Sequence, residues 1–142
     1  MAIVQAVANS FKEEILEGIH DLETGGNAIK LALYTSQATL TAATTSYTTG
    51  NEVAASGQYA AKGGTLQSQA VSLDTGVAIV DFADLSFTGV TLTARGALIY
   101  NSTQANKAIC ALDFGSDKTA TSGTFTIQFP AFTSTSAILR IA

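Results

Sequence analysis

The spacing of hydrophobic positions changes from a helical period to an alternating one near residue 26. In Ser10–Leu22, apolar side chains recur every three or four positions, which predicts an amphipathic helix over residues 10–22. Ser10 and Glu13 match a capping box, and Gly25-Gly26 is expected to end the element. Beyond Gly26 the period is two, which is typical of β-strands.

Residues 1–9 are predicted to form an N-terminal arm. Ile3, Val4 and Val7 are apolar at a terminus, where solvated polar residues are the commoner choice. Two hypotheses follow: the arm packs on its own domain, or it reaches a neighbouring subunit. The second makes these three residues candidates for an interface.

The rest of the chain, residues 10–142, is predicted to be a single all-β domain that includes the helix. Seven or eight short strands at spacings near ten residues favour an antiparallel β-sandwich or jelly roll with one N-terminal α-helix. Polar connections are expected at Asn101–Asn106 and Gly115–Gly123. The expected strands are Ile29–Tyr34, Thr65–Leu73, Val77–Phe82, Ser86–Thr93, Gly96–Tyr100, Lys107–Phe114, Thr124–Phe129 and Ala137–Ile141. Gly96–Tyr100 and Lys107–Phe114 are apolar on both faces, so we expect them in the centre of a sheet.

A long segment, residues 35–64, is rich in Ser, Thr, Ala and Gly. Loops of this length in a compact domain are usually functional or disordered. Tyr47 and Tyr59 lie within it, and tyrosine offers a large contact area at low entropic cost. We therefore predict an ordered contact loop, with both tyrosines as interface candidates.

Composition excludes several classes of function. The chain has one His, one Cys, no Trp, 13% charged residues and a formal net charge of -4. A lone Cys cannot form an internal disulfide. The seven Lys and Arg residues are scattered, so we expect no nucleic-acid partner. No apolar run is long enough for a transmembrane helix, and the N-terminus lacks the positive region of a signal peptide, so we expect no membrane partner and no secretion.

Residues that bear catalytic chemistry are few, and we expect structural roles for them. Cys110 lies in an apolar run and is predicted to be buried. His20 follows the carboxylates of the predicted helix and is expected at the surface or at the helix cap. No Gly-rich phosphate loop or nucleophile elbow occurs. We therefore expect no enzyme, no cofactor and no metal.

The acidic residues of the strand region also favour structural roles. The pair Asp81 and Asp84 is expected at a turn, as is the pair Asp113 and Asp117, and neither has the ligand spacing of a calcium loop. Arg95 precedes an apolar strand, and we expect it to pair within the chain with Asp81, Asp84 or Asp113. An intersubunit pair is the alternative.

Five segments together carry a resemblance to a known family: SFKEEILEGIHD, IKLALYTSQATL, ARGALIYNST, LDFGSDKTATSGTFTIQFPA and ILRIA. In their order along the chain they resemble a family of small virion structural proteins of tailed bacteriophages. The resemblance implies a structural role in the virion, assembled in the bacterial host cytoplasm, and supplies no catalytic or ligand residues.

Within the virion we expect a capsid decoration or cement protein that self-associates as a homo-oligomer and binds the major capsid protein. A structural role at the neck, the tail or the base of a fibre is the alternative. A different class of function is a carbohydrate-binding module, with Tyr34, Tyr47, Tyr59 and Tyr100 as its aromatic platform.

Overall fold

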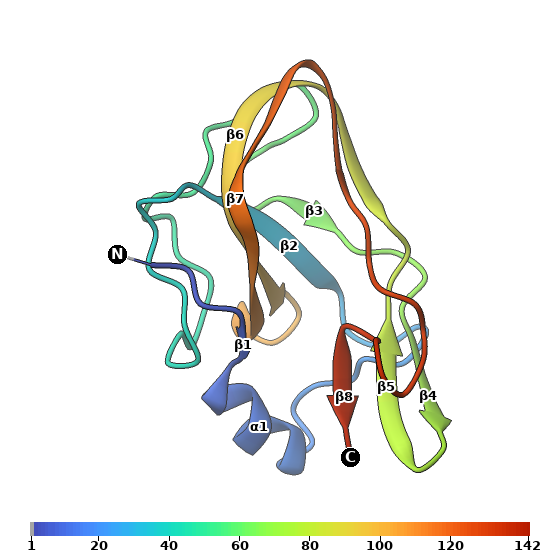
Figure 1. Ribbon diagram of the computed structural model, residues 1–142. Coiled ribbons are helices and arrows are strands. Elements are labelled where there is room, and N and C mark those ends of the chain that lie inside the picture. The colour runs from blue at the N-terminus through green and yellow to red at the C-terminus, as the bar shows by residue number, and fades with distance from the viewer. Residues whose placement is uncertain (1) are drawn as a thin grey trace.

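Two antiparallel sheets organise residues 2–142, which the computed structural model describes (Figure 1). The larger sheet has the order β1-β7-β6-β2-β3 and the smaller has the order β4-β5-β8. The strands are β1 (Ala6–Val7), β2 (Ile29–Tyr34), β3 (Gly64–Thr65), β4 (Ala70–Asp74), β5 (Val77–Asp81), β6 (Leu85–Asn101), β7 (Lys107–Ile127) and β8 (Leu139–Ile141). This confirms the predicted all-β sandwich with one N-terminal helix.

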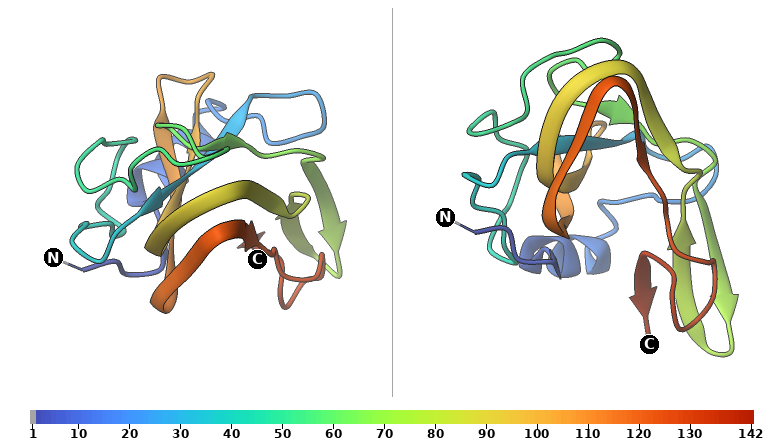
Figure 2. Two further views of the ribbon diagram at one scale, coloured as in Figure 1. Left: turned by 90° about the horizontal axis from the view of Figure 1, so that it is seen from above. Right: turned by 45° about the horizontal axis from the view of Figure 1, so that its top comes forward.

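β6 and β7 form one long hairpin that arches over the rest of the molecule (Figure 2). The sequence predicted four shorter strands here, and that prediction is wrong: the ladder runs from Leu85↔Ile127 to Asn101↔Lys107. Register shifts interrupt it, as between Phe87 and Val90. Such bulges add twist and bend, so the strands curve without ending. The expected connection at Gly115–Gly123 is therefore part of β7, where β-branched threonines suit a half-exposed strand.

The helix α1 (Asn9–Leu16) is shorter than predicted at its C-terminal end. Gly18 has φ +75°, the left-handed conformation that glycine adopts without strain. Its N–H donates to the Ile15 carbonyl, and the Ile19 N–H donates to the Glu14 carbonyl. This pair of bonds is a Schellman motif, which ends a helix at such a glycine. The prediction placed the end at Gly25-Gly26 and overlooked Gly18.

The predicted capping box at the start of α1 is also wrong. Ala8 occupies the N-cap position, and no side-chain hydrogen bond caps the helix. Ser10 is already inside the helix, and its buried hydroxyl has no hydrogen-bond partner among the described residues. Burial of Phe11 against the sheet therefore holds this short helix more than its own capping does.

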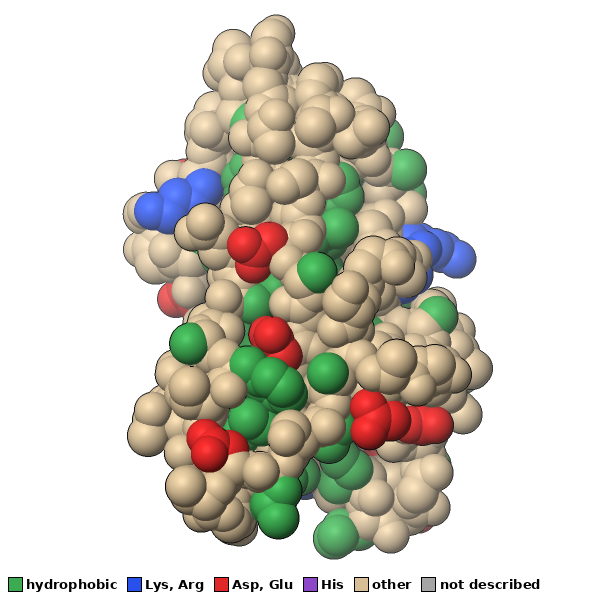
Figure 3. Space-filling view, turned by 90° about the vertical axis from the view of Figure 1, so that its right-hand side faces the viewer, with side chains coloured by type: hydrophobic (Ala, Val, Ile, Leu, Met, Phe, Trp, Pro, Cys, Tyr) green, Lys and Arg blue, Asp and Glu red, His purple; other side chains and the backbone are tan. Residues whose placement is uncertain are grey.

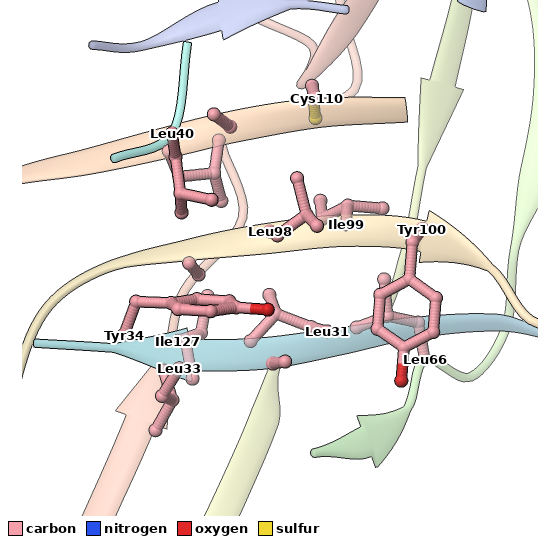
Figure 4. Close-up of a cluster of buried hydrophobic side chains, with 14 of the residues drawn as sticks. Leu31, Leu33, Tyr34, Leu40, Leu66, Leu98, Ile99, Tyr100, Cys110 and Ile127 are labelled. Carbon is pink, nitrogen blue, oxygen red and sulfur yellow. The ribbon is translucent and has the colours of Figure 1, made fainter. Parts of the chain in front are cut away.

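The core lies around β2 and the adjoining halves of β6 and β7 (Figure 4). Leu31, Leu98, Ile99 and Ile109 are completely buried, as expected for central strands covered on both faces. Cys110 lies among them, which confirms that it is buried. Fully burying such an aliphatic side chain contributes about 1.5–3 kcal/mol to folding, so this cluster dominates stability.

The N-terminal arm packs on its own domain. Ile3 is buried, and the Val4 N–H donates to the Leu40 carbonyl at 2.8 Å. Ala6 and Val7 pair with Ala111 and Cys110 of β7. Of the three apolar arm residues singled out in the sequence, Val4 alone is largely exposed. The first of the two hypotheses for the arm therefore describes its contacts.

Gly63 provides a test of how tightly the loop before β3 packs on β2. Its φ is +80°, and a Cβ at this position would lie 1.8 Å from the Leu31 carbonyl oxygen. Left-handed backbone alone costs a non-glycine residue about 1–2 kcal/mol. Because the added Cβ would also clash with Leu31, we expect Gly63→Ala to lower the free energy of unfolding by several times that amount. Gly76→Ala is the matched control, because Gly76 has φ +83° and open space around it. Urea unfolding measures both, and equal losses would contradict the close approach.

Candidate functional site

His20 is buried, which corrects the expectation of a surface or cap residue. Because α1 ends at Leu16, the chain turns back and packs the imidazole on Phe11. The ring joins α1 to the end of β6: Nε2 lies 2.9 Å from Glu14 Oε1, and Nδ1 lies 3.0 Å from the side-chain nitrogen of Asn101. Lys107 Nζ lies 3.6 Å from the other oxygen of Glu14.

The Asn101 amide determines which ring nitrogen of His20 accepts a hydrogen bond and which one donates. Its oxygen accepts the backbone N–H groups of Thr103 and Gln104, so its NH₂ group faces His20. Nδ1 must therefore accept, and Nε2–H donates to Glu14. Both ring nitrogens have partners, so the histidine anchors the end of α1 to the end of β6.

Arg95, Asp113 and Asp84 have structural partners, whereas the buried Oδ1 of Asp81 has no hydrogen-bond partner among the described residues. Arg95 Nε donates to Asp113 Oδ1 at 3.1 Å, which confirms the internal pair expected from the sequence. The pKa of Asp113 lies below its usual range because the Gly115 backbone N–H, and then Arg95, bind its carboxylate. Asp84 accepts the Phe129 N–H. Burial raises the pKa of the Cys110 thiol to about 12, so it is not a reactive thiolate.

Within residues 2–142 there is no group of three or more His, Cys, Asp and Glu side chains that could hold a metal ion. None of the helices in that range has the length and hydropathy needed to cross a membrane.

The tyrosine hydroxyls are bound inside the domain, two by one carboxylate and two by backbone carbonyls. Glu52 accepts hydrogen bonds from the hydroxyls of Tyr47 and Tyr59 and from the Lys62 backbone N–H. The Tyr100 hydroxyl donates to the Lys62 carbonyl at 2.6 Å. The Tyr34 hydroxyl donates to the Thr48 carbonyl, so the contact loop predicted at residues 35–64 is tied to the sheet by its own polar groups.

This burial decides what the tyrosines offer to a partner. Tyr34, Tyr59 and Tyr100 have 1% exposure or less, and Tyr47 is half-buried. They do not form the exposed aromatic platform that a carbohydrate-binding module would need. Of the residues singled out as interface candidates, Ile3 and Tyr59 serve the core, whereas Val4, Val7 and Tyr47 keep exposed surface.

The outer surface of the β6–β7 arch carries two rows of hydroxyl side chains, which we call the hydroxyl face. Alternate residues of the arch point inward and are buried, including Phe87, Leu92 and Phe125. Eight exposed positions between and beside them are Ser or Thr: Ser86, Thr88, Thr91 and Thr93 on β6, and Thr119, Thr121, Thr124 and Thr126 on β7.

Cross-strand hydrogen bonds order the hydroxyl face. Ser86 Oγ lies 2.9 Å from Thr126 Oγ1, and Thr93 Oγ1 lies 2.9 Å from Thr119 Oγ1. Figure 3 shows the upper part of the molecule with few charged side chains. The arch therefore presents a surface with short, partly fixed side chains and little charge to desolvate.

An apolar groove of about 730 Å³ lies at the other end, between α1 and the smaller sheet. Phe11, Leu22, Val80 and Leu139 form its buried floor. Leu16, Val71 and Ile141 line it and are exposed by 89%, 38% and 54%. The sequence did not predict this groove, because Leu16 was assigned to a longer helix and Ile141 to the end of a strand with no known neighbour.

Comparisons of this chain with models of protein families, with curated proteins and with solved structures found no match. Proposals about function therefore depend on these two surfaces and on the sequence.

The buried tyrosines and Cys110 predict loss of stability at alkaline pH. Burial raises the pKa of Tyr100 to about 12, and it also raises the pKa values of Tyr34, Tyr47 and Tyr59. A group with a raised folded pKa is neutral in the folded state while the unfolded chain already ionises. Stability is therefore intact below about pH 8.5 and falls as the pH rises toward 12, first through Cys110 and from about pH 10 through the tyrosines.

Urea unfolding as a function of pH measures this loss, with a slope of about 1.4 kcal/mol per pH unit for each group that ionises on unfolding. Tyr100→Phe removes one ionisable group and should make the dependence shallower above pH 10. Tyrosinate absorbance that rises near pH 10 while the protein stays folded would contradict the burial.

Proposed function

We propose that this protein is a structural component of a tailed-bacteriophage particle, namely a capsid decoration protein that self-associates and binds the major capsid protein. The observation that carries the proposal is the hydroxyl face: eight exposed Ser and Thr residues on one rigid two-stranded arch. The resemblance of five sequence segments to small virion proteins motivates the choice of partner.

The physical chemistry of the hydroxyl face supports protein docking. Interface cores are depleted in charged residues, and a charged side chain that ends unpaired at an interface is expensive to desolvate. Long charged side chains also lose up to about 2 kcal/mol of rotamer freedom when they are immobilised, whereas threonine is stiff at χ1. A surface of short hydroxyl side chains on a hydrogen-bonded ladder therefore loses little when it is covered.

The internal contacts of the ionisable groups support the same function. His20 and Glu52 form hydrogen bonds within the domain, and Arg95 pairs with Asp113. Each of these groups positions a helix, a loop or a strand, so their roles agree with a domain whose work is mechanical.

The position of the protein in the particle is tested by its copy number. Quantitative mass spectrometry or a cryo-electron map of the virion should find hundreds of copies on the capsid shell. A dozen copies or fewer would place the protein at the neck, the tail or a fibre base and would contradict the decoration role.

Charge introduced into the hydroxyl face tests whether this surface docks on the capsid. Thr88 and Thr121 are exposed, and their hydroxyls take no part in the side-chain hydrogen bonds found within residues 2–142. We expect Thr88→Lys with Thr121→Lys to weaken binding to undecorated capsids by about tenfold or more, because two ammonium groups would have to be desolvated. Co-sedimentation measures the binding.

Thr39→Lys is the single-site control, because Thr39 is an exposed threonine in a loop outside the arch. It should bind as the unmodified protein does, and urea unfolding should show that all variants are folded. Undiminished capsid binding by the double variant would contradict docking through the hydroxyl face.

A further inference from the structure

The smaller sheet has an apolar face that is only half covered. Residues opposite each other on paired strands share a face, so the strand register defines two rows across β4, β5 and β8. Val71, Val80 and Leu139 form the inner row, of which Val80 and Leu139 are buried in the core. Leu73, Ala78 and Ile141 form the outer row. Leu73 is 71% exposed and Ile141 is 54% exposed, so residues 2–142 leave much of the outer row uncovered.

Exposed apolar side chains concentrate at this end of the molecule. Six large hydrophobic residues in the described chain are exposed, and four of them belong to this sheet face or to the groove beside it: Leu16, Val71, Leu73 and Ile141. Contiguous apolar patches of this kind mark interaction sites, whereas single exposed hydrophobic residues are ordinary. β8 is also an edge strand, with β5 on one side only.

We propose that the partner of this surface is a second copy of the same chain, docked across a twofold axis so that Leu16 of each copy enters the groove of the other. This deepens the proposed function, of which self-association is a part, by naming the surface that performs it. In a twofold contact the same patch serves both copies, so it must carry both a projection and a hollow that fits it.

This patch has both shapes. Leu16 is 89% exposed at the last position of α1, so it projects from the rim. The hollow beside it has an apolar floor that includes Phe11 and Leu139. A leucine that enters such a floor exchanges water for apolar contacts on every side, which is how buried anchors dominate interfaces.

The charged residues on the rim of the groove favour a second copy of the chain over a partner whose surface is mainly basic or mainly acidic. Lys12 and Arg140 line the groove together with Asp21 and Glu23. A groove for a basic or an acidic partner would present mainly the opposite charge, whereas a patch that carries both signs can pair with a second copy of itself across a twofold axis. Lys12 lies one helical turn before Leu16, so entry of Leu16 brings this ammonium group to the acidic rim of the other copy.

Light scattering coupled to size-exclusion chromatography, over a range of protein concentrations, tests the proposal on the full chain. We expect a dimer, and we expect Leu16→Gln to raise its dissociation constant by about tenfold or more. Ile141→Gln should do the same. Val4→Gln is the matched control: Val4 is 52% exposed and lies in the arm, outside the groove. Urea unfolding confirms that each variant is folded.

Charge exchange tests the orientation of the two copies. Lys12→Glu and Glu23→Lys should each weaken the dimer, and the double variant should restore it, because opposite charges again meet across the axis. A monomer at every concentration would overturn the proposal, as would a dimer that Val4→Gln dissociates and Leu16→Gln does not. Failure of the double variant to restore the dimer would overturn the twofold orientation.

The two proposals fail separately. A monomeric protein present in hundreds of copies on the capsid would overturn the twofold contact and leave the decoration role intact. A dimer that resists dilution, loses affinity on Leu16→Gln and is missing from virions would overturn the decoration role instead.

Discussion

The ladder between β6 and β7 is the interaction on which the other features of this molecule depend. At one end, from Ala97 to Tyr100, β6 lies between β2 and β7 and is completely buried. At the other end the same two strands leave the core as the arch. Because backbone hydrogen bonds run along the whole hairpin, the buried end fixes the position of the exposed end. The hydroxyl face is therefore held by the core itself, without a flexible connection.

Ionisable side chains hold the segments between the strands in place. Glu52 ties residues 47, 59 and 62 of the long loop together, and His20 ties the end of α1 to the end of β6. A buried carboxylate or imidazole is tolerated only when its hydrogen bonds are satisfied, and here they are. The surfaces that remain are hydroxyl-rich at the arch and apolar at the groove.

The parts of this fold that could be predicted are those that a local pattern determines. Ile29–Tyr34 was predicted with its observed bounds, because Ile29, Leu31 and Leu33 recur at a period of two directly after a Gly-rich turn. The burial of Cys110 also followed from its apolar neighbours in sequence, whereas the sequence predicted an internal partner for Arg95 without choosing Asp113 over Asp81 and Asp84. The length of α1 was not predicted correctly, although Gly18 is a signal for the C-terminal end of a helix. The apolar residues beyond Gly18, Ile19 and Leu22, continue the helical spacing in sequence, although they lie in a segment that turns back after the helix ends.

The candidate surfaces were harder to predict because they depend on register. Gly115–Gly123 has the composition of a loop, and only pairing with Leu92, Thr93 and Ala94 makes part of it strand. Bulges break the period of two that identifies a strand, so a bent hairpin has the sequence pattern of several short ones. The groove is less local still: it combines residues 7–23 with 71–80 and 139–142. No pattern within any one of these segments indicates that they meet.

The arrangement of the two surfaces gives the proposed dimer a specific use. The arch lies at one end of the molecule, and α1 with β8 lies at the other (Figure 1). A twofold contact through the groove would therefore leave both hydroxyl faces uncovered and directed away from the axis. Each copy could then dock on its own capsid subunit while the groove contact joins the two. A second binding event within one linked pair takes place at high effective concentration, so modest affinity at each hydroxyl face suffices for lasting attachment. Weak, uncharged docking surfaces are what a protein repeated many times over a shell requires, since attachment strength then comes from the number of contacts.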